Sequence, residues 1–205
     1  MGLLTRERLI VPQVRDRVLN EGAAFVRPNG FSSDHAASIW DALVQGPGQH
    51  VVLHWLRMLD HNIEDLVYID GKRAGRLALL KIQGKGRIPL RSMGDGLTKL
   101  FHIALAVASS PNGVLLIDEF ENGLHWNVQA RLWDALARAA SEQNVQVFAT
   151  THSRDCIEAF TPAVKDSGPE AASIYRMERK GDGVLAVELP LLNVDAAMRE
   201  NEEVR

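Results

Sequence analysis

VLLIDEFENGLHW, residues 114–126, is the stretch that decides the fold. Its first four residues are apolar, which predicts a short strand buried on both faces, as in a parallel sheet. Two carboxylates, Asp118 and Glu119, follow the strand directly. Ligands of open α/β sheets bind beyond the carboxyl ends of the strands, so these carboxylates are candidates for a site at that edge. The alternative is a strand that simply ends in a solvated acidic turn.

A second apolar run, residues 145–150, leads into Thr150-Thr151-His152-Ser153. Residues 127–143 between the two runs have the pattern of an amphipathic helix. Strand, helix and strand together predict a βαβ unit whose two strands lie side by side and parallel. His152 is therefore expected at the same edge as Asp118, where it can donate a hydrogen bond to a phosphate. The alternative is a capping turn before the next helix.

A third candidate segment, SMGDG at residues 92–96, directly precedes an apolar helix predicted over residues 97–109. Glycines leave backbone amides accessible, and the N-terminus of a helix attracts anions. A phosphate contact and an ordinary loop-to-helix cap both fit this segment. The three segments in this order are more specific for a phosphate site than any one of them.

The rest of the chain is organised around this core. Residues 1–50 form an N-terminal segment with helices predicted over 5–19 and from residue 33 to Gly46, and without recognisable chemistry. Further predicted elements are a helix at 51–59, a hairpin of 66–69 with 77–82, a short strand at 87–90, and a hairpin of 173–179 with 184–189. Alternating helices and buried strands predict an α/β fold with a parallel sheet flanked by helices and a C-terminal antiparallel hairpin.

Composition excludes several classes of protein. The length of 205 residues favours one domain, or one domain with a small appendage, and a hydrophobic fraction of 46% argues against a disordered chain. A net charge of −3 argues against a globally basic nucleic-acid binder. The single cysteine excludes an intrachain disulfide and fits a reducing compartment. With no secretion signal and no apolar run long enough to span a bilayer, a soluble cytoplasmic protein is expected.

Taken together, SMGDG, VLLIDEFENGLHW and ATTHS resemble the C-terminal half of ABC-type and AAA-type ATPases. The most similar group contains the overcoming-lysogenisation-defect and RecF/SMC-like proteins. The resemblance covers residues 51–205 and is strongest over 91–160. It implies a P-loop NTPase-like fold, ATP and Mg²⁺ as cofactors, and ATP hydrolysis as the activity. It also implies a signature that touches the γ-phosphate across a dimer interface, formed by Ser92, Gly94 and Gly96.

The resemblance assigns a role to each remaining motif residue. Asp118 is expected to hold the magnesium ion as the Walker B carboxylate, and Glu119 to be the general base. Asn122 is expected in the D-loop at the same interface, and His152 to be the switch histidine that senses the γ-phosphate. Trp126 stands where the family usually has proline, a difference expected to be neutral.

One departure from the family outweighs these matches. A P-loop of the form G-x-x-x-x-G-K-[ST] is absent, because neither Gly71-Lys72 nor Gly84-Lys85 has the required neighbours. The chain therefore resembles a family member truncated at its N-terminus, without the strand and helix that flank the P-loop. Such a core is expected to expose a sheet edge and an apolar face.

Three hypotheses follow. In the first, the chain is half of an ATP-hydrolysing site whose P-loop comes from a partner ATPase chain or homologous protomer. In the second, it is a non-hydrolysing regulatory module that acts in trans on a full-length ATPase. In the third, it is an inactive gene fragment. A DNA or nuclease partner is implied by the resemblance alone. Outside the motifs, Cys156 is expected to pack in a short helix, and His50, His54 and His61 to lie on a helix surface. For Arg91, Lys99 and Arg131, solvated positions are favoured over contacts with phosphate or DNA.

Overall fold

A computed structural model of the chain describes residues 22–71, 75–165, 172–181, 183–189 and 191. The chain divides into two compact units, one of residues Leu19–Ala163 and one of Met1–Val18 together with Val164–Arg205. The helix predicted over residues 5–19 lies outside the described residues.

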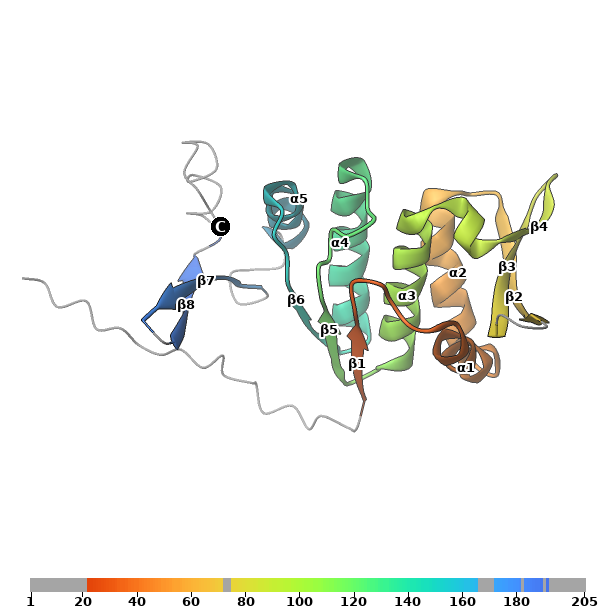
Figure 1. Ribbon diagram of the computed structural model, residues 1–205, viewed down its shortest axis with the longest axis horizontal. Coiled ribbons are helices and arrows are strands. Elements are labelled where there is room, and N and C mark those ends of the chain that lie inside the picture. Colours follow the sequence, from red (N-terminus) through yellow and green to blue (C-terminus); the bar gives the residue numbers. More distant parts are fainter. Residues whose placement is uncertain (1–21, 72–74, 166–171, 182, 190, 192–205) are drawn as a thin grey trace, which may run out of the picture. The chain divides into compact units, whose positions relative to one another are not determined.

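A parallel three-stranded sheet carries the candidate residues. Its strand order is β1 (Ala23–Val26), β5 (Val114–Ile117) and β6 (Gln146–Ala149), and α4 (Trp126–Glu142) connects β5 to β6 (Figure 1). The predicted βαβ unit is thereby confirmed. Strand β1 is missing from the sequence predictions because Ala-Ala-Phe-Val is short and alanine has a low strand propensity.

Helix α3 (Asp95–Ser109) is the central helix of the core. It contacts β1 and β5 of the parallel sheet and also packs against three other helices, α1, α2 and α4. On the side of the sheet that faces the core, Val26, Leu115 and Ile117 are at most 2% exposed. The near-continuous apolar sequence of α3 follows from this burial on several sides.

Apolar side chains are exposed on the opposite face of the parallel sheet. Phe25, Leu116 and Phe148 are register partners across β1, β5 and β6, and they are 48%, 40% and 40% exposed. We call these three side chains the apolar row. In the described part of the chain β6 pairs with β5 alone, so its outer edge is free. The expected apolar face and open edge are both present.

An antiparallel sheet forms the other end of the Leu19–Ala163 unit, with strand order β2 (Ile63–Gly71), β3 (Gly75–Ile82) and β4 (Gly86–Pro89). Helix α1 (Ser33–Val44) contacts β3, and α2 (Gly48–Leu59) contacts β2. These helices and strands agree with the predicted elements. Residues 22–44 thus share one hydrophobic core with the residues that follow.

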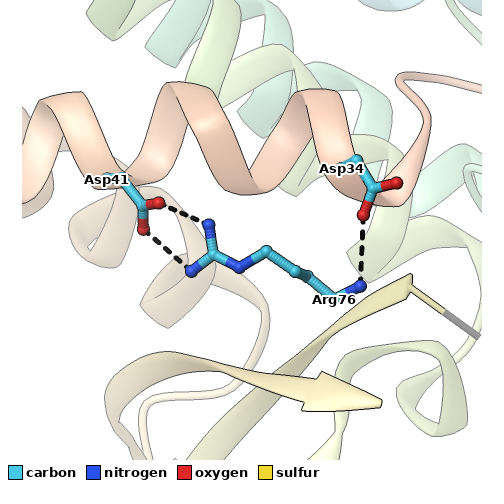
Figure 2. Close-up of polar contacts among 3 residues, drawn as sticks. All are labelled: Asp34, Asp41 and Arg76. Carbon is cyan, nitrogen blue, oxygen red and sulfur yellow. Dashed lines mark hydrogen bonds and ion pairs between the residues drawn. The ribbon is translucent and has the colours of Figure 1, made fainter. Parts of the chain in front are cut away.

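Arg76 links α1 to the antiparallel sheet (Figure 2). Its guanidinium forms a two-pronged ion pair with the carboxylate of Asp41, and its backbone N–H donates to Asp34 Oδ1 at 3.2 Å. The hydrogen bonds from Arg76 lower the pKa of Asp41 below its usual value. Because both side chains are partly exposed, the link fixes geometry more than it adds stability.

The remaining elements are a 3₁₀ turn, η1 (Leu90–Met93), before α3, the helix α5 (Arg154–Lys165) after β6, and an antiparallel hairpin of β7 (Ile174–Lys180) and β8 (Gly183–Leu189). The predicted C-terminal hairpin is confirmed. None of the helices in the described residues is long and apolar enough to cross a membrane.

Candidate functional site

Thr150 joins the two strand ends at the carboxyl edge of the parallel sheet. Its Oγ1 donates a hydrogen bond to Asp118 Oδ1 at 2.6 Å and accepts one from the backbone N–H of Glu119 at 3.0 Å. Backbone bonds from Phe120 N to Thr150 O and from Thr150 N to Ile117 O, each 2.9 Å, hold the same two strand ends together. The carboxylate of Asp118 is therefore fixed at the edge where parallel sheets bind ligands.

Glu119 occupies an unusual backbone conformation, with a φ of 47°. Non-glycine residues adopt the left-handed region at a cost of roughly 1–2 kcal/mol, and such residues concentrate at functional sites. The conformation ends β5 abruptly and starts the loop toward α4. The Glu119 side chain is partly exposed, and its Oε2 accepts a 3.5 Å contact from Asn122 Nδ2. The predicted base and the predicted D-loop residue are thus neighbours.

Glu121 positions the loop that carries His152. Its Oε1 accepts a hydrogen bond from the backbone N–H of His152 at 2.9 Å, while its Oε2 is buried without a partner among the described residues. The imidazole of His152 is exposed to solvent. Glu121 is thus a positioning carboxylate, and the signal that points to it is the third acid in the DEFEN segment.

The segment SMGDG contacts the loop that follows Glu119. A Cβ built on Gly96 would lie 3.0 Å from Gly123 O, and one built on Gly123 would lie 3.1 Å from the Cβ of Asp95. A side chain at either glycine would push its neighbour away by a few tenths of an ångström. Ser92 and Gly94 are exposed, and Gly94 has a φ of 95°, a left-handed value that favours glycine. The structure therefore brings the predicted signature and D-loop together.

Lys99 is buried, although the sequence analysis predicts a solvated position for it. The side chain, only 4% exposed, lies on α3, where Nζ donates to Asp118 O at 3.0 Å and to Arg27 O at 3.3 Å. Burial lowers the pKa of Lys99, and the nearby carboxylates of Asp118, Glu119 and Glu121 oppose that change. The prediction is wrong because the sequence does not show that the carbonyls of Arg27 and Asp118 lie close to Lys99 at the sheet edge. Arg91 and Arg131 are exposed, as predicted.

Another segment of the site lies in a region where the sequence analysis finds no chemistry. The turn after β1 and Asp118 line one open hollow of about 540 Å³. The lining residues are Phe25, Arg27, Pro28, Asn29, Gly30, Phe31, Ser32 and Asp118. The position of the turn depends on the pairing of β1 with β5, which cannot be read from the sequence.

The carboxylates of the site fit magnesium only as an ion that is also bound by a nucleotide. In the described residues no group of three His, Cys, Asp or Glu side chains is placed to hold a metal ion. Mg²⁺ commonly takes one or two carboxylates and completes its shell with water and substrate phosphates. Asp118 therefore fits a magnesium ion that arrives with a nucleotide and does not fit a metal held by protein alone.

Comparison with known proteins identifies the family. Residues 6–155 match the family model described as "AAA domain, putative AbiEii toxin, Type IV TA system". The chain belongs to this AAA-domain family. The matched range includes SMGDG, VLLIDEFENGLHW and ATTHS, on which the resemblance to AAA-type ATPases rests.

Two curated relatives are similar to part of the chain. An ATP/GTP phosphatase of Helicobacter pylori is 31% identical over 115 residues, which are 54% of this chain and 30% of that protein. Uncharacterized protein MJECL11 of Methanocaldococcus jannaschii is 34% identical over 94 residues, 46% of this chain and 82% of that protein. The chain thus spans about 30% of the length of the Helicobacter phosphatase.

Solved structures agree on the fold. A structure reported under "Structural biochemistry of ATP-driven dimerization and DNA stimulated activation of SMC ATPases" has a TM-score of 0.56 and 15% identity, over 82% of this chain and 99% of that one. An Smc head domain with a coiled coil and joint, derived from Pyrococcus yayanosii, has a TM-score of 0.54 and 15% identity, over 81% and 31%. The AAA-domain chain therefore has the fold of SMC ATPase heads.

Proposed function

We propose that the chain provides one side of a composite ATP-hydrolysing site and acts with a second polypeptide that carries the P-loop. The observation that carries the proposal is the pair Asp118 and Glu119, joined by Thr150 at the carboxyl edge of the parallel sheet. Membership of an AAA-domain family and similarity to an ATP/GTP phosphatase support a nucleoside triphosphate as substrate.

Each residue of the site has a stated task in this proposal. Asp118 would hold the magnesium ion that accompanies ATP, and the ion would neutralise charge on the phosphates. Glu119 accepts a proton from the attacking water as general base. His152 donates a hydrogen bond to the terminal phosphate, and Glu121 fixes the backbone that carries it.

The signature residues act at the interface between polypeptides. Ser92 and Gly94 are exposed, and the contact of Gly96 with Gly123 places this segment beside the loop of Asn122. Amides at the N-terminus of α3 are suited to bind the terminal phosphate of a nucleotide held by the partner.

Three features support the proposal that the P-loop is supplied from outside residues 1–205. Its sequence has no G-x-x-x-x-G-K-[ST] segment. In the described residues β6 has a free outer edge, and the apolar row is 40–48% exposed. A strand added to β6 and a helix laid over Phe148 and Leu116 would complete a parallel sheet covered on both faces.

Replacement of Glu119 tests the proposed activity. The chain is mixed with a P-loop-bearing AAA-domain protein as the candidate partner, and phosphate release from ATP is measured. We expect Glu119→Gln to lower turnover by about 10²–10⁴-fold and to leave ATP binding intact, because only the general base is lost. Glu142→Gln, an exposed position on α4, is the matched control.

The result separates the two functional hypotheses. Unchanged turnover with Glu119→Gln, while the same change in the partner's own base abolishes it, would mean that this chain is a non-hydrolysing regulatory module. The isolated chain is expected to bind ATP·Mg²⁺ only in the millimolar range, about −4 kcal/mol, because it has no phosphate cradle. Micromolar binding in calorimetry would contradict the need for a partner.

A further inference from the structure

Arg27 and Asp118 occupy equivalent places at the ends of neighbouring parallel strands. Val26 of β1 pairs with Ile117 of β5, so Arg27 follows one strand where Asp118 follows the other. A backbone hydrogen bond of 2.9 Å from Asp118 N to Val26 O ties the two strand ends together. Both residues line the same open hollow.

The turn that carries Arg27 is held in place by α3. Gly30 N donates to Arg27 O at 2.8 Å and closes the turn, and Lys99 Nζ binds the same carbonyl at 3.3 Å. Phe31 N donates to Nδ1 of the buried His102 at 3.3 Å. Because Lys99 also binds Asp118 O, one side chain fixes the backbones of Arg27 and Asp118 relative to each other.

The Arg27 guanidinium lies at an acidic edge of the sheet and is available to bind a ligand. Asp118, Glu119 and Glu121 make this edge of the sheet acidic, and the ammonium of Lys99 is buried against carbonyls. Arg27 is exposed, and within the described residues its guanidinium has no ion pair or hydrogen bond. A free arginine beside a magnesium-binding carboxylate is suited to a phosphate that the same ion holds.

We propose that Arg27 is a phosphate-binding residue of this site and forms charge-assisted hydrogen bonds to the nucleotide whose magnesium ion Asp118 holds. This inference rests on the proposed function. It adds a cation to a site whose other predicted residues are acidic, neutral or glycine. The planar guanidinium can donate two parallel N–H groups to phosphate oxygens, a geometry that lysine lacks.

Titration of the ¹⁵N-labelled full chain with ATP·Mg²⁺, followed by NMR, tests the inference. We expect the amide signals of Asn29 and Gly30 to shift in the wild-type chain. Arg27→Ala should weaken binding at least about tenfold, and Arg27→Lys should recover only part of it. The control Arg87→Ala removes an exposed arginine from β4 and should leave the affinity unchanged.

A parallel titration of Asp118→Asn separates this inference from the proposed function. If Asp118→Asn weakens binding and Arg27→Ala stays within twofold of wild type, Arg27 has no phosphate role although the site stands. If Arg27→Ala weakens binding and Asp118→Asn does not, the arginine is confirmed and the magnesium assignment fails. Absence of any shift at Asn29 and Gly30 in the wild-type chain would overturn the Arg27 proposal.

Discussion

His102 lies in the middle of α3 and accepts a hydrogen bond from Phe31 N. Burial, assisted by the positive charges of Lys99 and Arg91, lowers its pKa to about 4 from 6.5. Between these two pH values the unfolded chain binds more protons at this residue than the folded chain does. The contribution of His102 to stability is therefore complete above pH 6.5 and is lost as the pH falls toward 4.

We expect this histidine to reduce the free energy of unfolding by about 3 kcal/mol on acidification. Urea unfolding at several pH values measures the effect in the wild-type chain and in His102→Gln, whose amide can still accept the bond from Phe31. The variant should be less pH-sensitive over this range. His54→Gln, at an exposed position on α2, should keep the wild-type slope. Equal slopes for wild type and His102→Gln would contradict the assigned cause.

Cys156 is fully buried in α5, and burial raises its pKa to about 11. Its thiolate fraction at neutral pH is consequently very small, and thiolate is the reactive form. We expect a disulfide reagent to modify the folded chain at least about 10³-fold more slowly than the unfolded chain, because reaction requires local opening. Stopped-flow absorbance with and without denaturant gives the ratio. Similar rates in both conditions would show that the thiol is accessible.

At the scale of elements, the turn after β1 and helix α3 are packed without spare room. A Cβ on Gly30 would lie 1.6 Å from His102 Nδ1, whereas a Cβ on Gly84 would meet nothing within 4 Å. Both glycines have a φ of 73°. The two positions therefore separate the cost of a left-handed backbone from the cost of a steric clash.

We expect Gly84→Ala to lower the free energy of unfolding by about 1 kcal/mol and Gly30→Ala by about 3 kcal/mol. Chemical denaturation of both variants measures the difference. Gly30→Ala and His102→Ala together should cost less than the sum of the two single changes, since the clashing ring is then removed. Equal effects of the two glycine substitutions would mean that the turn moves away from α3 freely.

The sequence predicts elements well where a long pattern specifies them. Helix α4 and the strands on either side of it follow from one amphipathic stretch between two apolar runs. Strand β1 escapes prediction because four residues with two alanines carry almost no pattern. Its neighbours in the sheet are far away in the sequence, so its role becomes visible only through pairing.

For the site too, the sequence predicts what a contiguous pattern specifies and misses what depends on contacts between distant segments. The motif residues are found because they are contiguous, as in VLLIDEFENGLHW. Thr150 and Lys99 form hydrogen bonds with Asp118 and its backbone, which are distant in the sequence, and Arg27 lines the same hollow as Asp118. Their residue types occur on ordinary surfaces too, which is why the sequence alone assigns Lys99 to solvent. The functional roles of Ser92, Glu119 and the other motif residues remain predictions.

At the scale of the whole chain, the apolar row makes self-association the expected behaviour in the absence of a partner. Exposed contiguous apolar side chains next to a free strand edge favour contact between copies. We expect sedimentation velocity to show association that grows with concentration, and Phe148→Lys to reduce it. Ile69→Lys, which alters a side chain of similar exposure (41%) on β2, should have little effect. If Phe148→Lys associates as strongly as the wild-type chain, the apolar row is not the cause of the association.

The fluorescence of Trp126 should respond to the proposed assembly. It is 66% exposed at the first residue of α4, whereas Trp40, Trp55 and Trp133 are 3–8% exposed. Iodide in solution should therefore quench the fluorescence of Trp126 and leave the fluorescence of the three buried tryptophans largely unquenched. Since Trp126 follows the Asn122 loop, a polypeptide that settles there would shield it. Trp126 thus serves as a built-in fluorescent reporter of docking.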